Sequence, residues 1–268
     1  MMKRVERGQA EQRSGSRWAS GALSALLLLC AVSGAYLAGP TTAEVVARKR
    51  ELPIYCVERD DQAISISFDA AWGGDKTKKI LDILDEFGVK ATFFIVDIWT
   101  QKYPELVKEI AARGHSLGNH STTHPKMSTL SREKITQELE TMSGNVEKLV
   151  GVRPALFRPP YGDYNNDVVL TARSLGYEVI QWSVDSLDWK NKGVQPLIDR
   201  ATKNVKSGDI VLFHNDSQYI VEALPTILKS YQAQGLRVIP LPDLLLNGET
   251  IIDAQGRQRP GAATVPEV

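Results

Sequence analysis

The sequence has few of the residues on which disulfide-stabilised or nucleic-acid-binding proteins depend. Only two of its 268 residues are cysteine, and Cys30 lies in an apolar run while Cys56 lies in the soluble part, so no structural disulfide is available within the domain. Lysine plus arginine and aspartate plus glutamate each total 32, which gives no net formal charge. Without a basic stripe or an RNP-like aromatic motif, we expect no nucleic acid partner.

Charge is also absent between Arg17 and Glu44, where the sequence WASGALSALLLLCAVSGAYLAG is long enough to cross a bilayer as a helix of about 20 residues. Basic residues outnumber acidic ones before this run, which places the amino terminus in the cytoplasm and the remainder outside. We therefore expect residues 1–17 to be a cytoplasmic basic segment and residues 18–40 to anchor the chain in the membrane. The small-residue segments SGA and TTA leave a cleaved signal sequence, and thus a secreted protein, as the alternative.

The rest of the chain divides by composition into a linker, a folded domain and a tail. Residues 41–60 are charged and contain a proline, which is typical of a linker. The apolar, periodic sequence of residues 61–246 predicts one domain. Residues 247–268 are rich in glycine, proline and polar residues, and we expect a flexible C-terminal tail there.

Two hydrophobic periods alternate along the domain. Apolar, β-branched runs predict strands over residues 64–68, 91–96, 116–118, 155–157, 178–184, 210–213 and 236–240. Helical patterns lie between them over residues 77–87, 104–113, 131–150, 167–175, 195–205 and 223–233. About seven alternations of strand and helix predict an α/β fold with a mostly parallel sheet, either an open doubly wound sheet or a closed barrel.

Polar residues follow the predicted strands at the ends that carry chemistry in parallel barrels, where one rim holds the active site. They are Asp69, Asn119, His120, Arg158, Asp185, Asp188 and His214. Each has a plainer explanation by itself, because an aspartate after a strand usually caps a helix or a turn. Their joint arrangement at one rim nevertheless favours a metal-assisted hydrolytic site.

Two of the four histidines belong to this set, and a third, His124, lies four residues after His120. The spacing of His120 and His124 is weakly specific, because Ser121 replaces the glutamate of the H-E-x-x-H metalloprotease motif. Pro125 disfavours a helix at His124, so we expect the two imidazoles on a tight loop, where they can still share a cation. His115, at the opposite end of its strand, is expected to be structural.

The aromatic residues near these motifs allow two interpretations. Trp72, Trp182 and Trp189 are either core or site residues, and the position of Trp182 inside a predicted strand favours the core. The run FRPPYGDYN contains two consecutive prolines and predicts a rigid loop.

Five segments, SFDAAWG, HSTTH, RPPYG, DSLDW and VLFH, occur in this order. The ordered set resembles the five motifs of the NodB-homology polysaccharide deacetylases, carbohydrate esterase family 4, over about residues 63–246. The segments FDAAWG, DSLDWK and LFHN most resemble the PdaB-like sporulation proteins of spore-forming bacteria. The resemblance implies a distorted (β/α) barrel of fewer than eight strands, here about seven. It also implies removal of N-acetyl groups from a GlcNAc-containing polymer in the cell wall or spore envelope.

The same resemblance implies roles for individual residues. His120 and His124 are identified as ligands of a divalent metal, most often zinc, with cobalt as a second choice. Asp69 is identified as the general base for the attacking water, held by Arg158. The resemblance assigns the remaining positions to oxyanion stabilisation by the Tyr161 N–H, to acid catalysis by His214 held by Asp188, and to an acetyl pocket lined by Trp189 and Leu212.

The sequence departs from the family pattern at one metal position. Most active members carry a second aspartate directly after the base, and this chain has Ala70 there. Catalytic zinc normally has three protein ligands, so we consider Asp75 as a replacement ligand. The alternative function is a weak or inactive homologue that binds glycan or assists spore assembly. The base and acid pair favours the enzyme, because glycan binding needs neither, and an unrelated metallohydrolase such as a peptidase is a more distant alternative.

Overall fold

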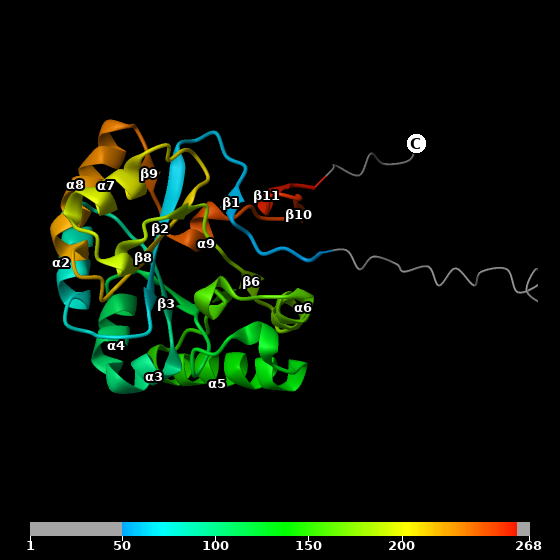
Figure 1. The fold of residues 1–268 in the computed structure, drawn as a ribbon. Coiled ribbons are helices and arrows are strands. Elements are labelled where there is room, and N and C mark those ends of the chain that lie inside the picture. The colour runs from blue at the N-terminus through cyan, green and yellow to red at the C-terminus, as the bar shows by residue number, and fades with distance from the viewer. Residues whose placement is uncertain (1–49, 262–268) are drawn as a thin grey trace, which may run out of the picture. The chain divides into compact units, whose positions relative to one another are not determined.

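A computed structural model describes residues 50–261 of the chain (Figure 1). The predicted cytoplasmic segment, the predicted membrane-spanning or signal helix, and residues 41–49 of the predicted linker lie outside the described residues. Residues 262–268 of the predicted tail lie outside them as well. Between residues 50 and 261, none of the helices is long and apolar enough to cross a membrane.

Parallel strands form the centre of the fold. Seven of them follow the order β6-β5-β4-β3-β2-β8-β7, and β9 pairs with the first residues of β2. Their bounds are β2 (Ala63–Ala70), β3 (Thr92–Ile95), β4 (Ser116–Asn119), β5 (Leu156–Phe157), β6 (Glu178–Val179), β7 (Val184–Asp185), β8 (Ile210–His214) and β9 (Arg237–Val238). Every pairing is parallel, and β6 and β7 stay unpaired with each other, so the sheet is a half-barrel. The expected α/β fold with about seven parallel strands is confirmed.

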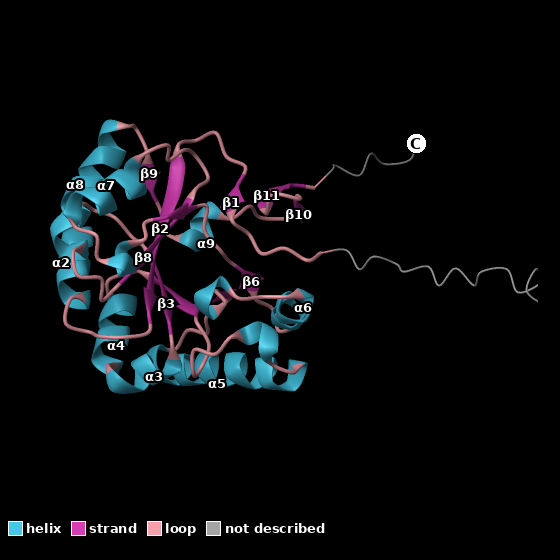
Figure 2. Ribbon diagram, viewed as in Figure 1, coloured by secondary structure: helices cyan, strands magenta, loops and turns pink. Residues whose placement is uncertain are grey.

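Helices cover the outer face of this sheet (Figures 1 and 2). They are α2 (Thr77–Glu86), α3 (Asp97–Lys102), α4 (Pro104–Ala112), α5 (Arg132–Val150), α6 (Asn166–Ser174), α7 (Val194–Thr202) and α8 (Ile220–Ala233). The short helix α9 (Leu241–Leu244) packs instead with Ala63, Phe94 and Ile210 in a separate hydrophobic cluster. The longest, α5, begins where the Ser131 hydroxyl accepts the Lys134 N–H and ends at Gly151 in a left-handed conformation. Short 3₁₀ turns η1 (Met127–Thr129), η2 (Pro160–Gly162) and η3 (Asp188–Lys190) occur in the connections.

Strand β2 runs through the middle of the core, and all of its residues are buried. Ile64, Ile66 and Phe68 belong to the hydrophobic cluster shared with the helices, where the Phe68 ring stacks on Phe93 and Phe213. Because side chains alternate along a strand, Asp69 then faces the other side of the sheet. This alternation brings a carboxylate to the inner side of the half-barrel at the carboxyl end of β2.

The predicted strand over residues 178–184 is two strands, because residues 180–183 leave the ladder. Ile180 forms an isolated bridge with Ile54, and Gln181 turns its carbonyl to Arg158 and its amide to Gly162. The two short helices α3 and α9 were not expected from the pattern. At six and four residues, they are too short to show a helical repeat of apolar residues.

The expected boundaries of the linker and the tail differ from the structure. A second sheet has the order β1-β11-β10, formed by β1 (Cys56–Val57), β10 (Thr250–Ile252) and β11 (Arg257–Pro260). Cys56 and Ile54 are buried, and Gln258 donates and accepts hydrogen bonds inside the domain. The folded domain therefore includes the end of the predicted linker and the first part of the predicted tail, which polar composition alone does not reveal.

Candidate active site

The carboxyl ends of the strands surround a cavity of about 530 Å³. Strands β2 and β8 are neighbours, and their register places Asp69 directly beside His214. His120 and His124 reach the same cavity from the loop after β4, and Tyr161 reaches it from η2. The structure thus brings together residues that are more than 140 positions apart in the sequence, as expected from the parallel topology.

Asp69 forms a buried ion pair with Arg158. Arg158 Nη1 lies 2.8 Å from Asp69 Oδ1, and Nη2 donates to the Gln181 carbonyl at 3.1 Å. The guanidinium is fully buried and lies over the Phe94 ring, 4.1 Å from its centroid. Burial by itself would raise the pKa of Asp69, but the charge of Arg158 outweighs it, and the pKa lies below its ordinary value. The carboxylate is therefore ionised at neutral pH and able to accept a proton.

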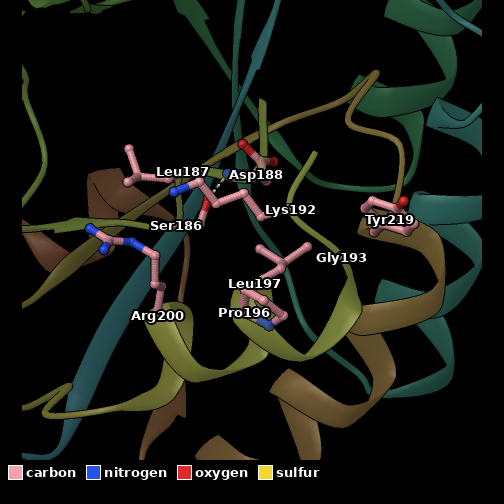
Figure 3. Close-up of a pocket in the computed structure, with 9 residues that line it drawn as sticks. All are labelled: Ser186, Leu187, Asp188, Lys192, Gly193, Pro196, Leu197, Arg200 and Tyr219. Atoms are coloured by element: carbon pink, nitrogen blue, oxygen red, sulfur yellow. Dashed lines mark hydrogen bonds between the residues drawn. The ribbon is translucent and has the colours of Figure 1, made fainter. Parts of the chain in front are cut away.

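His214 is held by Asp188 on the other side of the cavity. Its Nδ1 donates to Asp188 Oδ1 at 2.7 Å, and its backbone N–H donates to Oδ2 at 2.8 Å. Burial acts to lower the pKa of His214, but the bond and charge of Asp188 raise it above the ordinary value. Figure 3 shows Asp188 above α7, with its backbone bonded to Ser186. The pair is built to keep His214 protonated.

The two loop histidines have the protonation state of metal ligands. His120 Nδ1 lies 2.7 Å from the Arg158 carbonyl, which only accepts, so Nδ1 carries the proton and Nε2 is free. Burial lowers the pKa of His120 and lowers that of His124 to about 4, which keeps both rings neutral. The rings lie 5.0 Å apart between centroids, and the buried Nδ1 of His124 has no hydrogen-bond partner in residues 50–261. These two side chains fit a divalent metal.

A third protein ligand does not accompany them. Asp75 is exposed and does not line the cavity. Ala70 is buried at the end of β2 in the hydrophobic cluster. Across the described part of the chain, no three His, Cys, Asp or Glu side chains are grouped as a metal site would require. The candidate metal ligands are therefore limited to the two histidines. The Asp69 carboxylate lies nearby, with its Oδ2 3.5 Å from His120 Nε2.

The loop that carries the histidines is held by Glu138, which the sequence did not identify. Glu138 Oε2 accepts the N–H groups of Thr122 and Thr123 at 2.8 Å, and Oε1 accepts the Thr123 hydroxyl. Ser121 and His124 both have positive φ angles, which are uncommon outside glycine. A helix residue fourteen positions after His124 carries no local signal for this role, because only the packing of α5 brings it to the loop.

Aromatic side chains form the rim of the cavity. Trp72, Tyr161 and Trp189 are 58%, 65% and 54% exposed, so neither Trp72 nor Trp189 is a core residue. Trp182 also lines the cavity and is partly buried, so the favoured core interpretation is incomplete. Leu212 lies on the floor, and Tyr161 has a left-handed backbone with φ of 60°. His115 lies outside this cavity, and its Nδ1 accepts the Ala91 N–H, which is a structural contact.

Comparisons with known proteins extend over most of the domain. A model of the polysaccharide deacetylase family matches residues 57–180. The chain is 38% identical over 194 residues to a peptidoglycan-N-acetylglucosamine deacetylase of Bacillus cereus, which covers 70% of this chain and 91% of that protein. The solved structure of PdaA from Bacillus subtilis, a family 4 carbohydrate esterase, has a TM-score of 0.68 at 31% identity and covers 72% of this chain and 84% of that one.

A structure with a different description is equally similar. A Bacillus anthracis protein described as a CE4 family pseudoenzyme has a TM-score of 0.69 at 32% identity, covering 72% of this chain and 68% of that one. A mutant of that protein is described as having restored enzymatic activity, with a TM-score of 0.69. On the identity and coverage of these relatives, the chain belongs to the polysaccharide deacetylase family, the NodB-homology family known as carbohydrate esterase family 4.

Proposed function

We propose that this protein is a metal-dependent hydrolase that removes N-acetyl groups from the amino sugars of peptidoglycan. The observation that carries the proposal is the pairing of Asp69 with Arg158 and of His214 with Asp188, with Asp69 and His214 side by side on neighbouring strands at one cavity. Such a site can take a proton on one side of an amide and give one on the other. The relatives described as peptidoglycan deacetylases supply the substrate class.

The reaction follows from the ionisation of these two pairs. Asp69 accepts a proton from water as the water oxygen bonds to the acetyl carbonyl carbon. His214 then donates its proton to the amide nitrogen as the carbon–nitrogen bond breaks, so that acetate and an amine leave. Arg158 keeps Asp69 deprotonated and fixes its orientation. Asp188 keeps His214 protonated and fixes the orientation of its ring. The Tyr161 N–H is proposed as a donor to the oxyanion, and Leu212 and Trp189 as the walls of the acetyl pocket.

His120 and His124 would hold the metal, zinc or cobalt, because both rings are neutral. His124 Nδ1 has no hydrogen-bond partner within residues 50–261, and the unprotonated His120 Nε2 faces the Asp69 carboxylate at 3.5 Å. When bound, the metal would polarise the acetyl carbonyl and make water more acidic. An amide requires this help, since it is a poor electrophile with a poor leaving group.

A second function is favoured by Ala70. Two histidines bind a metal more weakly than the usual three protein ligands, and a pseudoenzyme is among the similar structures. In this case the protein would bind glycan through the aromatic rim without hydrolysing it. We favour the enzyme, because both proton-transfer pairs are complete in the cavity.

Acetate release decides between these functions. We would supply the full-length chain with zinc or cobalt, add N-acetylglucosamine oligomers or peptidoglycan, and measure acetate together with bound metal. Acetate release that needs about one metal per chain and disappears on chelation supports the enzyme. Glycan binding without acetate release by metal-loaded protein supports the second function.

We further propose an extracytoplasmic site of action in the cell wall or spore envelope, with the chain anchored or secreted through residues 18–40. The apolar run and the positive charge before it support this location. The assignment to the PdaB-like sporulation branch stays a prediction, because several of the similar proteins are described as peptidoglycan deacetylases more generally.

A further inference from the structure

The active-site cavity shares two lining residues with a second cavity of about 600 Å³. Trp182 and Asp185 line both cavities. The second cavity lies among β1, the carboxyl end of α7 with the loop that follows it, and the turn between β10 and β11. We call it the basic groove and define it by Arg200, Lys203, Lys206 and Arg257 together with the two shared residues.

Positive charge dominates the basic groove. Its only acidic lining residues are Asp185 and Asp209, against four cationic side chains. Asp209 is 4% exposed, and its carboxylate accepts the Ser183 hydroxyl and the Lys206 N–H, both at 2.9 Å. Asp185 accepts the Leu187 N–H at 2.8 Å. Both carboxylates are thus used by hydroxyl and backbone groups of the protein.

The cations of the groove have no carboxylate partner of their own. Arg200 donates Nε to the Asp185 carbonyl at 3.2 Å and extends from α7 toward the Ser186–Leu187 segment (Figure 3). Within residues 50–261, none of the four groove cations forms an ion pair. Every other arginine in that range except Arg50 forms one. The groove therefore concentrates guanidinium and ammonium groups that are available to an anion.

The catalytic cavity has the opposite character. No lysine or arginine is among its lining residues in the described chain, and its rim is aromatic. A neutral sugar ring stacks well on such a rim, and the described residues of the rim offer no lysine or arginine to a carboxylate. A polymer that occupies both cavities would therefore be recognised by stacking at one end and by charge at the other.

We propose that the basic groove binds carboxylate groups on sugars adjacent to the one that loses its acetyl group. The inference rests on the proposed function and specifies its substrate as an acidic glycan, such as one with muramic acid residues, rather than a neutral one such as chitin. Arginine is suited to this, because its planar guanidinium matches a carboxylate with two parallel hydrogen bonds. Lys203 and Lys206 add charge that attracts the polymer before it docks.

The test compares one oligosaccharide in two charge states. The probes are the tetrasaccharide of alternating GlcNAc and MurNAc with free lactyl carboxylates, and the same tetrasaccharide with those groups converted to amides. The variant is the triple substitution Arg200→Gln, Lys203→Gln and Lys206→Gln, whose three side chains are exposed. The control is Lys78→Gln, Lys79→Gln and Lys229→Gln, which changes the net charge equally at exposed positions outside both cavities.

We expect the full-length variant to bind the acidic tetrasaccharide about tenfold more weakly than wild type, with the change in KM rather than kcat. Binding of the amide form should be unchanged, and the control should match wild type with both probes. The wild-type preference for the acidic form should decrease as salt is added. Equal affinity of wild type for the two forms, or equal loss with both in the variant, would overturn the proposal.

Calorimetry measures this binding independently of acetate release, so the two proposals fail differently. If neither tetrasaccharide releases acetate while the charge-dependent difference in affinity persists, the proposed hydrolysis is wrong and the groove proposal stands. If both forms release acetate with the same kcat/KM and bind equally, the hydrolysis stands and the groove proposal is wrong.

Discussion

At the scale of single residues, the two groups proposed to transfer protons have been given opposite ionisation by their neighbours. Asp69 has a lowered pKa beside Arg158, and His214 has a raised pKa beside Asp188. A base must be deprotonated and an acid protonated at the same pH, and these shifts widen the range over which both conditions hold. The pH range in which Asp69 is deprotonated and His214 is protonated lies between the lowered pKa of Asp69 and the raised pKa of His214.

The first prediction is the pH dependence of turnover by the metal-loaded enzyme. Activity should fall as pH rises through the pKa of His214, which lies above its ordinary value of 6.5, because the acid loses its proton. The Asp188→Asn variant removes the negative charge that raises this pKa, so the alkaline limb should move to lower pH. A kcat profile over pH 5–9 measures this, and an unchanged alkaline limb in Asp188→Asn would show that His214 is not the titrating acid.

The second prediction concerns the Asp69→Asn substitution. The asparagine cannot take a proton from water, so kcat should fall by a factor of about 10²–10⁴. It also leaves the buried Arg158 guanidinium without a counter-charge, which should lower the free energy of unfolding by about 3 kcal/mol.

Chemical denaturation and acetate release, measured on the same sample of Asp69→Asn, separate the two effects. His214→Ala is the matched comparison, because it should lose activity with a smaller loss of stability. Equal stability of Asp69→Asn and wild type would mean that the Arg158 charge is satisfied without Asp69.

At the scale of secondary-structure elements, the loop that carries His120 and His124 is held by helix α5, although no residue of α5 lines the cavity. The third prediction is that Glu138→Ala weakens cobalt binding by about 10–100-fold, because the loop N–H groups lose their acceptor. Glu138→Gln should be intermediate, since its amide oxygen can accept both N–H groups but carries no charge, and its NH₂ group cannot accept the Thr123 hydroxyl. Calorimetric titration with cobalt measures the affinity without requiring activity.

Glu140→Ala is the control for Glu138 on the same helix. Glu140 is exposed and pairs with Arg153 at 2.7 Å, away from the loop. We expect wild-type cobalt affinity in this variant. If both alanine variants lost affinity equally, the effect would belong to α5 as a whole and not to the contacts of Glu138.

The second sheet provides the fourth prediction. The Gly256 carbonyl accepts the Tyr55 N–H, and Gln258 of β11 accepts the N–H groups of Glu58 and Leu246, so a chain ending at Asn247 loses those hydrogen bonds. At about 1 kcal/mol for each bond, the melting temperature should fall by roughly 5–10 °C relative to a chain ending at Gly261. Below that temperature, acetate release should persist, because no residue of β10 or β11 lines the catalytic cavity. An unchanged melting temperature would show that the sheet adds no stability.

At the scale of the whole molecule, the sequence predicted the parallel sheet and the rim much better than the borders of the domain. Strong periodicity and the polar residues after strands located Asp69, His120 and His214, because these signals are local. Glu138 and β11 were missed, since their partners lie far away in the sequence and their composition is ordinary for a surface. Asp75 was proposed from nearness along the chain, and the turn after β2 leaves it exposed outside the cavity.

The last prediction treats the metal as a ligand of the folded state. At a zinc concentration 100 times the dissociation constant, binding should stabilise the full-length chain by about 2.7 kcal/mol. Differential scanning calorimetry should then record a rise in melting temperature of roughly 5–10 °C. The His120→Ala, His124→Ala double variant should show no rise, and persistence of the rise there would place the metal elsewhere.

The Ala70→Asp variant completes this test, because the family pattern has an aspartate at that position. A carboxylate buried at the end of β2 should lower the melting temperature without metal, since its charge is desolvated. With zinc present, the added ligand should make the metal-dependent rise larger than in wild type and increase acetate release. A variant that is destabilised equally with and without zinc would mean that residue 70 cannot reach the metal. Weak metal binding would then result from the direction in which β2 points the side chain of residue 70, and not only from the missing carboxylate.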